Sequence, residues 1–318
     1  MITDWTFPNL SIEEEILRDA GIEVVARQCK TEEELTSFCS EADAVITQFA
    51  RVNRTVISSM QRARGIIRYG IGVDNVDLDA ARDRGIPVCN VPDYCIDEVA
   101  DQTLAFLLAT TRQVVPHARA LREGNWGLVT SLSEMKALRD LTVSVVGFGR
   151  IGREVVKRLL AFKCAVQVFD PMVSAEEVER CGARAVSLEA AFANADVLTL
   201  HCPSTPQTRR MLNRESLATL PRGAVVINVS RGDLADSEAL TQALSSGHLS
   251  AAALDVFDPE PIPKGHPILS MSNVVLAPHI ASCSMPAVKQ LRESAARLAV
   301  AAVQGGALRS VVNGVVKA

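Results

Sequence analysis

The stretch VGFGRIG places Gly147, Gly149 and Gly152 in the pattern G-x-G-x-x-G, and it constrains the fold more than any other feature of the chain. In a dinucleotide-binding turn the first glycine makes the bend, the second lets the backbone approach a pyrophosphate, and the third lets helix and strand pack closely. The pattern alone also fits a glycine-rich bend that binds nothing, so its context has to decide.

The residues around the glycines supply the context that a dinucleotide-binding turn requires. The run LTVSVV leads directly into Gly147, and the segment from Arg150 to Phe162 carries apolar residues at helical spacing. The following run, AVQVFD, ends on Asp170, close to the expected spacing of about 20 residues. A carboxylate at this place accepts from both ribose hydroxyls of the adenosine and repels the extra phosphate of NADP, so we expect NAD.

Short β-branched runs alternate with helical stretches along the whole chain, which predicts the α/β class with parallel sheets. A chain of 318 residues is long enough for two domains. The expected strands are Ile22–Ala26, Ala44–Gln48, Gly65–Tyr69, Pro87–Asn90, Thr142–Val146, Ala165–Phe169, Val197–His201, Ala224–Val229, Ala251–Val256 and Val274–Ala277.

Two longer helical stretches stand out from this alternation. From Asp97 to about Arg122 the pattern is continuously helical, with Pro116 as a kink or a restart. After Ser284 the chain is helical again to about Val303 and ends in a short apolar tail. The tail is too short to form a domain, so we expect it to pack back on the first domain.

Composition excludes several classes of protein. With 48% hydrophobic residues, 22% charged residues and a net charge of -4, the chain can bury a large core and has no basic block for nucleic acid or an anionic membrane. It has no signal-peptide pattern and no membrane span of ~20 apolar residues, so we expect a cytoplasmic protein. The 8 cysteines lack the spacing of a zinc site, so we expect reduced thiols and no metal.

Polar side chains that follow the later strands are candidates for chemistry, because ligands of doubly wound sheets lie at the carboxyl ends of the strands. These residues are Arg231 in VINVSRGDLAD, Asp255 and Glu260 in ALDVFDPEP, and His279 in VVLAPHIAS. An arginine, a carboxylate and a histidine together supply an anion clamp, an orienting base and a proton donor. That set suits the reduction of a 2-oxo acid.

Each of these residues also has an ordinary structural explanation. Arg231 can pair with a nearby aspartate on a solvated turn, and Glu260 can be a surface acid in a proline-rich loop. His279 can be a hydrogen-bonded histidine near the core. Their shared place at strand ends favours function. His201 also follows a strand and is a second candidate for the acid, ranked below His279.

Six motifs spread over most of the chain carry a resemblance to a known family. They are RYGIGVDNVDLDAA, NVPDYCIDEVADQT, VGFGRIGREV, INVSRGDLAD, ALDVFDPEP and APHIAS. In these motifs the chain resembles the D-isomer-specific 2-hydroxyacid dehydrogenases. That family includes phosphoglycerate dehydrogenases, glyoxylate/hydroxypyruvate reductases and the C-terminal-binding-protein corepressors.

The resemblance implies a role for each catalytic candidate. Arg231 holds the substrate carboxylate and carbonyl, His279 is the general acid/base, and Glu260 pairs with His279. An ionised Glu260 favours the imidazolium form that donates the proton. The planar fork of Arg231 fits a carboxylate in a way that a lysine does not.

The resemblance also implies the residues that bind substrate and cofactor. The backbone amides of Ile71 and Gly72 receive the substrate carboxylate, and Arg68 resembles a substrate contact of the corepressor branch. Asp255 binds the nicotinamide carboxamide. The full set of implied cofactor residues is Gly147, Gly149, Arg150, Ile151, Gly152, Asp170, Thr103, Val229, Asp255 and Ser282.

The fold that the resemblance implies has two domains. A smaller flavodoxin-like α/β substrate domain is built from both termini, at 1–101 and 286–318, and a Rossmann NAD-binding domain is inserted at 102–285. Family members commonly pair through the cofactor domain, so the resemblance implies a homodimer. The other expected partner is a small 2-oxo or 2-hydroxy acid.

The sequence thus predicts an NAD-dependent oxidoreductase that transfers hydride between nicotinamide and C2 of a 2-oxo acid or D-2-hydroxy acid. The alternative is a corepressor-like binding protein that senses NAD(H) with weak or no turnover. Two departures from the family stand out. Lys163 takes the place of a glycine after a helix, in a left-handed position that costs roughly 1 kcal/mol. Ser282 takes the place of a corepressor tryptophan, which weakens the transfer of that branch's substrate preference.

Overall fold

The computed structural model describes residues 1–316 of the chain. These residues divide into two compact units. Unit 1 contains Met1–Tyr94 and the chain from Ser284 onward, and unit 2 contains Cys95–Cys283. No helix within residues 1–316 is long and apolar enough to cross a membrane.

Unit 1 is built around a parallel sheet of flavodoxin-like order. Its strands are β1 (Val45–Thr47), β2 (Ile66–Arg68) and β3 (Val88–Cys89), paired in that order. Ile2 extends this sheet, because it forms parallel bridges to Ile46 on one side and to Ala26 on the other. The parallel segments therefore follow the order 2-1-3-4-5 that defines a flavodoxin-like fold.

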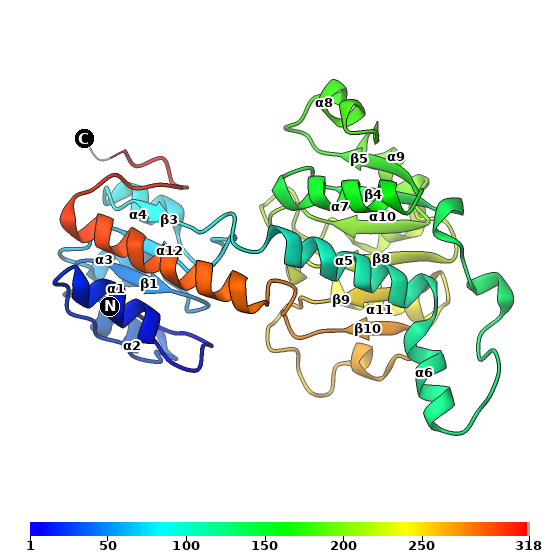
Figure 1. Ribbon diagram of the computed structural model, residues 1–318, viewed down its shortest axis with the longest axis horizontal. Coiled ribbons are helices and arrows are strands. Elements are labelled where there is room, and N and C mark those ends of the chain that lie inside the picture. The colour runs from blue at the N-terminus through cyan, green and yellow to red at the C-terminus, as the bar shows by residue number, and fades with distance from the viewer. Residues whose placement is uncertain (317–318) are drawn as a thin grey trace. The chain divides into compact units, whose positions relative to one another are not determined.

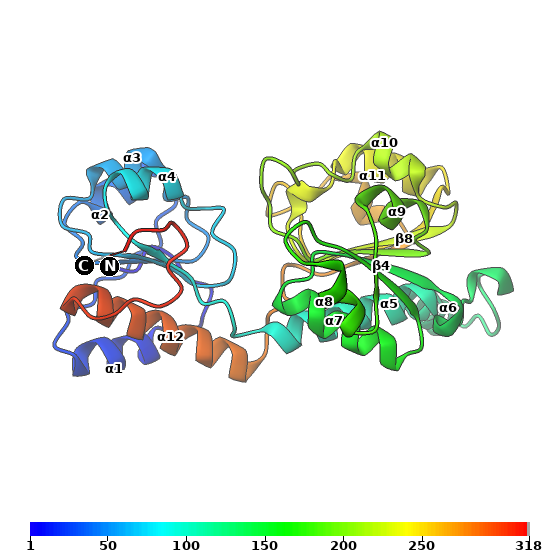
Figure 2. The same ribbon diagram turned by 90° about the horizontal axis from the view of Figure 1, so that it is seen from above.

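Helices cover both faces of the unit 1 sheet (Figures 1 and 2). Helices α1 and α12 lie on one face, and α2, α3 and α4 lie on the other (Figure 2). Their bounds are α1 Ser11–Asp19, α2 Glu32–Cys39, α3 Arg54–Ser59, α4 Leu78–Asp83 and α12 Met285–Gln304. Ser284 caps α12 by accepting the amide of Ala287, and the left-handed Gly305 ends it.

Unit 2 is built around a seven-stranded parallel sheet of Rossmann order. Its strands are β4 (Thr142–Val146), β5 (Ala165–Phe169), β6 (Arg184–Ala185), β7 (Val197–Leu200), β8 (Ala224–Asn228), β9 (Leu249–Leu254) and β10 (Val274–Leu276). They are arranged as β10-β9-β8-β7-β4-β5-β6, so the strand order reverses between β4 and β7. Dinucleotides bind at such a reversal, at the carboxyl ends of the strands.

The helices of unit 2 lie on both faces of this sheet (Figure 2). Helices α5 and α7 cover one face, and α9, α10 and α11 cover the other (Figure 2). The bounds are α5 Ile96–Thr111, α6 Val114–Arg122, α7 Arg150–Ala161, α8 Ala175–Arg180, α9 Leu188–Ala193, α10 Arg214–Thr219 and α11 Ser237–Ser245. Short 3-10 turns are η1 Leu132–Glu134, η2 Leu138–Asp140, η3 Gly232–Leu234 and η4 Pro267–Ser270.

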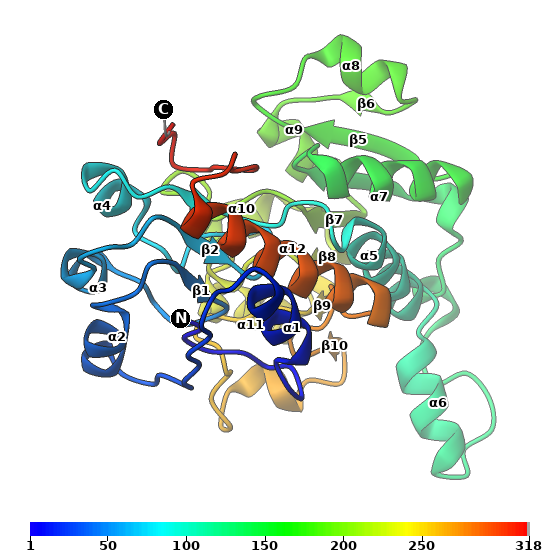
Figure 3. The ribbon, with the colours of Figure 1, turned by 60° about the vertical axis from the view of Figure 1, so that its left-hand side comes forward.

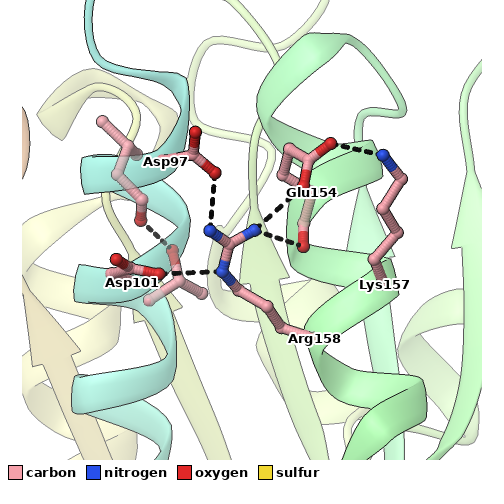
Figure 4. A network of polar contacts seen from close by, with 7 residues as sticks. Asp97, Asp101, Glu154, Lys157 and Arg158 are labelled. Carbon is pink, nitrogen blue, oxygen red and sulfur yellow. Dashed lines mark hydrogen bonds and ion pairs between the residues drawn. The ribbon is translucent and has the colours of Figure 1, made fainter.

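An ion-pair network joins α5 to α7 (Figure 4). The guanidinium of Arg158 on α7 contacts Asp97 at 2.7 Å and Asp101 at 2.8 Å on α5, and Glu154 at 3.0 Å on its own helix. Lys157 also contacts Glu154. One arginine thus has three carboxylate partners on two helices, and a network of this kind contributes more than an isolated surface pair.

Helix α6 and the chain after it form an arm with an apolar surface. Gln113, with a φ of 52°, interrupts the helical stretch, and α6 then extends away from α5 and α7 (Figure 3). The exposed apolar side chains of this arm are Val114, Val115, Leu121, Trp126, Leu128, Val129 and Leu132. Trp126 is 91% exposed and Leu132 is 75% exposed. Single exposed apolar residues are normal, whereas a group of this kind makes the arm a candidate interaction surface.

The expected fold class is confirmed, with differences at the ends of elements. Strands β4 and β5 have the bounds that the sequence predicts. The predicted strand Ile22–Ala26 is reduced to a bridge at Ala26, and the two-residue strand β6 was not predicted. The helical stretch restarts at α6, but the break lies at Gln113, and Pro116 sits in the first turn of α6, where its missing N–H costs nothing.

Candidate active site

The glycine turn follows β4, and its geometry is set by contacts that leave no room for a side chain. Gly147 has a φ of 99°, and a β-carbon there would lie 2.6 Å from the carbonyl carbon of His201. A β-carbon on Gly152 would lie 2.1 Å from the carbonyl oxygen of Gly147. A β-carbon on Gly149, by contrast, would meet open space. The turn is therefore packed at its first and third glycines and open at its second.

The open side of the turn lies at the N-terminus of α7, because Gly149 is the N-cap residue of that helix. The free amides of a helix N-terminus attract anions such as a pyrophosphate. Asp170 follows β5, and its two carboxylate oxygens accept the amides of Phe148 at 2.6 Å and Met172 at 2.8 Å. Each oxygen keeps a second lone pair for a hydroxyl donor. These residues fit a dinucleotide with its ribose on Asp170.

The remaining cofactor candidates differ in how far they are exposed. Arg150 and Ile151 are the first two residues of α7, and Ser282 directly follows the buried Ala281. Val229 is 8% exposed. Thr103 on α5 is 1% exposed, and its hydroxyl donates to the carbonyl of Val99 at 2.8 Å.

The loops after β8, β9 and β10 bring the three catalytic candidates to one edge of the unit 2 sheet. His279 Nδ1 lies 2.8 Å from Glu260 Oε2, and Glu260 Oε1 accepts the amide of Phe257 at 2.9 Å. Burial alone would raise the pKa of Glu260. The hydrogen bond and charge of His279, the Phe257 amide and the charge of Arg231 outweigh burial and lower that pKa. Glu260 is thus held as a carboxylate, and it fixes the imidazole by its Nδ1 atom.

Asp255 anchors the segment that carries His279. This side chain is 0% exposed, and its carboxylate accepts the amides of Ile280 at 2.8 Å and Ala281 at 2.9 Å. The amide of His279 donates to the carbonyl of Asp255 at 2.7 Å. His279 itself has a left-handed φ of 55°, a conformation that costs a residue with a β-carbon free energy and that the surrounding bonds must impose.

Burial raises the pKa of Asp255, and the amides of Ala281 and Ile280 and the charge of His279 oppose this shift. The sequence predicted Asp255 as a nicotinamide contact and gave no sign of its bonds to the histidine segment. Each oxygen again keeps a lone pair, so a carboxamide N–H remains a compatible partner.

The Arg231 loop is held by residues that sequence reasoning missed. Asn228 donates to the carbonyl of Arg231 at 2.8 Å and accepts the amide of Ser230 at 3.0 Å. A β-carbon on Gly232 would lie 1.9 Å from the carbonyl carbon of Phe257. The backbone of the Arg231 loop therefore packs directly on the loop of Glu260. The glycine after Arg231 was the only signal of this contact in the sequence.

The predicted substrate loop lies in unit 1, directly after β2. Arg68 ends β2 and is 8% exposed, and its guanidinium occupies the space in which a β-carbon of Gly70 would lie. Asn90 donates to the carbonyl of Ile71 at 2.6 Å, and the amide of Val91 donates to the carbonyl of Gly70 at 3.0 Å. The loop after β3 thus holds the loop of Ile71 and Gly72. Asn90 is a further residue that sequence reasoning missed.

His201 is a poor candidate for the acid. Burial of its ring lowers the pKa of His201 to about 3, so it is neutral near physiological pH. Its Nε2 lies 2.9 Å from the hydroxyl of Thr199, and its backbone packs under Gly147. His201 is part of the support of the glycine turn.

Strand order, glycine turn and Asp170 define unit 2 as a Rossmann-type dinucleotide-binding domain. Residues 104–281 match the family model described as "D-isomer specific 2-hydroxyacid dehydrogenase, NAD binding domain". The chain therefore belongs to the D-isomer specific 2-hydroxyacid dehydrogenase family, and this segment is its NAD binding domain.

Relatives support the same assignment. D-3-phosphoglycerate dehydrogenase of Methanocaldococcus jannaschii is 35% identical over 305 residues, which cover 94% of this chain and 56% of that protein. A glyoxylate reductase from Paecilomyes thermophila has a TM-score of 0.89 at 26% identity, covering 98% of this chain and 97% of that one.

D-lactate dehydrogenase from Aquifex aeolicus, complexed with NAD and lactic acid, has a TM-score of 0.84 at 25% identity, covering 96% of this chain and 95% of that one. The chain spans only about half the length of the phosphoglycerate dehydrogenases it matches.

Proposed function

We propose that the chain is an NAD-dependent oxidoreductase that transfers hydride between nicotinamide and C2 of a 2-oxo acid or D-2-hydroxy acid. The observation that carries this proposal is the 2.8 Å contact of His279 with Glu260, at the carboxyl edge of an NAD binding domain and within the electrostatic reach of Arg231. An imidazole oriented by a carboxylate is the usual form of a general acid and base. The unit from Cys95 to Cys283 serves as the cofactor domain, and unit 1 carries the substrate loop.

His279 holds the proton that reaches or leaves the substrate oxygen. With Nδ1 on Glu260, its Nε2 is the atom that donates to the developing alkoxide in reduction and accepts the hydroxyl proton in oxidation. Glu260 keeps this orientation and stabilises the charged ring. Arg231 orients the substrate by its carboxylate and polarises the carbonyl. The bound nicotinamide supplies or accepts the hydride.

The substrate carboxylate is received in this proposal by the backbone amides of Ile71 and Gly72, with Arg68 beside them. The cofactor is held by Gly147, Gly149 and Gly152, by Arg150 and Ile151 at the start of α7, and by Asp170, Thr103, Val229, Asp255 and Ser282. The preference for NAD over NADP is assigned to Asp170, because its charge opposes a 2′-phosphate.

We also propose a homodimer that forms through the apolar arm of residues 114–132. Seven apolar side chains of this arm are exposed, and Trp126 is 91% exposed. A second copy of the chain offers the same surface in return, as a two-fold interface requires. Light scattering should give twice the chain mass for the protein and the single mass for the double variant Trp126→Asp, Leu132→Asp. The proposed location is the cytoplasm.

The decisive experiment follows NADH absorbance against a panel of 2-oxo acids: glyoxylate, hydroxypyruvate, pyruvate, phosphohydroxypyruvate and branched analogues. One active class is expected, and His279→Ala should lower kcat by about 10²- to 10⁴-fold while NADH binding stays the same. Unchanged turnover would remove His279 from the mechanism. Tight NADH binding with no turnover on any member of the panel would favour the NAD(H)-sensing protein instead.

A further inference from the structure

Unit 1 contains a buried ion pair that the proposed chemistry does not use. Glu13 on α1 is 0% exposed, and the side chain of Arg292 on α12 is 8% exposed. Arg292 Nε lies 2.8 Å from Glu13 Oε1, and Arg292 Nη2 lies 2.6 Å from Glu13 Oε2. Nη2 also donates to the carbonyl of Asn9 at 2.7 Å. The pair is bidentate, and its carboxylate is completely buried.

Tyr69 connects this ion pair to the substrate loop. Its hydroxyl donates to Glu13 Oε1 at 3.0 Å, and its side chain is 1% exposed. The ring of Tyr69 packs edge to face on the ring of Phe7, with the two centroids 5.3 Å apart. The guanidinium of Arg292 lies over the same Phe7 ring, 5.0 Å from its centroid. Tyr69 is the residue between Arg68 and Gly70, so the side chain that Glu13 holds belongs to the first residue of the loop.

The loop is therefore held from two sides. On one side Tyr69 is tied to Glu13 by its hydroxyl and to the carbonyl of Thr47 by its amide at 2.8 Å. On the other side Asn90 and Val91 bond the carbonyls of Ile71 and Gly70. Carbonyls that are engaged by neighbours fix the peptide planes, and with them the direction of the amides that would receive a carboxylate.

Stability alone is a weak reason for such a pair. Taking two charges out of water costs several kcal/mol per ion, and replacing a buried ion pair by apolar residues is often neutral or stabilising. A charged pair gives instead a directional, bidentate geometry that apolar packing does not. Here the carboxylate that Arg292 orients accepts the hydrogen bond of the Tyr69 hydroxyl, at the start of the loop.

We propose that Glu13 and Arg292 are positioning residues for the substrate-carboxylate loop, acting through Tyr69. This inference rests on the proposed function, in which the amides of Ile71 and Gly72 bind the substrate carboxylate. The ligand chemistry concerned is the carboxylate of a 2-oxo acid. None of the three residues belongs to the proposed catalytic set of Arg231, Glu260 and His279, so we expect their effect on substrate binding and not on the chemical step.

The test uses Tyr69→Phe, which keeps the ring and its packing and removes only the hydroxyl. KM for the active 2-oxo acid should rise about three- to tenfold, as expected for one buried hydrogen bond, while kcat and the Kd of NADH stay unchanged. Arg292→Lys keeps the charge without the fork and should give a smaller rise in KM. Equal KM values for Tyr69→Phe and the wild type would overturn the proposal.

A matched control separates positioning from loss of stability. Asn313 is also buried in unit 1, and its amide group bonds the backbone of Val88 and Ile86 and none of the residues 69–73. Asn313→Ala should lower the melting temperature and leave KM unchanged. A KM that rises equally in Asn313→Ala would show that any loosening of unit 1 has the same effect, and would contradict a specific role for Tyr69.

Two measurements test the inference even if the chain shows no turnover. Amide hydrogen exchange of the peptide that contains residues 69–73 should become faster in Tyr69→Phe, with other unit 1 peptides unchanged. Oxamate, a non-reducible 2-oxo acid analogue, should bind the NADH complex about three- to tenfold more weakly. Unchanged exchange together with unchanged oxamate binding refutes positioning, whereas absent turnover alone refutes the proposed enzyme activity.

Discussion

The two ends of the candidate site in unit 2 are shaped by opposite means. Around β4 the turn takes its form from missing side chains, since Gly147 and Gly152 pack backbone on backbone. Around β9 and β10 the loops take their form from carboxylates, since Asp255 and Glu260 hold the segment of His279. Substitutions around β4 should therefore destabilise the protein through steric clashes, and substitutions around β9 and β10 through the loss of hydrogen bonds and charge.

The largest effect is expected at the glycines, where two alanine substitutions should behave differently. Gly152→Ala places a β-carbon 2.1 Å from a backbone oxygen that cannot rotate away, so we expect a loss of about 3 kcal/mol in unfolding free energy. Gly149→Ala meets open space and should keep the wild-type melting temperature but weaken NADH binding at least about tenfold, or 1.4 kcal/mol. Similar melting temperatures for the two variants would contradict the steric account.

Asp255→Asn should lower the free energy of unfolding by about 2 kcal/mol. The amide side chain offers one acceptor for the two backbone amides of Ile280 and Ala281, so one buried donor loses its partner. The segment of His279 should loosen, and kcat should fall with stability. Chemical denaturation and steady-state kinetics on the same preparation measure both. A fall in NADH affinity with no loss of stability would assign Asp255 to the cofactor alone.

Glu260→Gln should lower kcat about tenfold and remove the part of the pH dependence of protein stability that Glu260 causes. The pKa of Glu260 is lowered in the folded state, so its ionised contact with His279 stabilises the protein above the ordinary glutamate pKa of about 4.3. That stabilisation is lost as the pH falls through the lowered pKa. The difference in stability between wild type and Glu260→Gln should shrink in this acid range. A constant difference from neutral pH to pH ~3 would show that Glu260 is not the titrating group.

Lys163→Gly should have the smallest effect, and it should stabilise the protein. Lys163 follows α7 with a φ of 66°, which confirms the left-handed position that the sequence predicted. Glycine removes a strain of about 1 kcal/mol there and should raise the melting temperature by about 2–4 °C. Lys163→Ala keeps the strain and serves as the control. A decrease in the melting temperature of Lys163→Gly would mean that the lysine side chain makes a compensating contact.

Local sequence patterns predicted the fold well where one element determines its own bounds. Strands β4 and β5 were placed correctly because each is a β-branched run with a turn signal at its end. The pattern of Ile22–Ala26 predicted a full strand, whereas the segment forms only one bridge, because it lies at the sheet edge and has a single neighbour. The break of the long helix was expected at Pro116, although Gln113 carries it, because proline is tolerated in a first turn.

The candidate site was predictable to the extent that its residues follow strands or belong to motifs. Arg231, Glu260 and His279 were found by both routes, and the structure places them at one sheet edge. Asn90, Asn228 and Gly232 act through backbone groups of other loops, and such partners leave no local pattern. The bond between Glu13 and Arg292 joins residues separated by 279 positions, so only the folded chain reveals it.

The late return of α12 to unit 1 has a consequence for biosynthesis. Unit 2 is one continuous stretch of chain, whereas unit 1 needs a helix that begins at Met285. At ribosomal rates of about 5–20 residues per second, tens of seconds separate the emergence of Glu13 from that of its counterion 279 positions later. During that interval unit 2 can fold first. Glu13 on α1 then has no counterion, and the face of α1 that α12 will cover is still exposed. Nascent chains that stop before α12 should therefore be the form most in need of a chaperone.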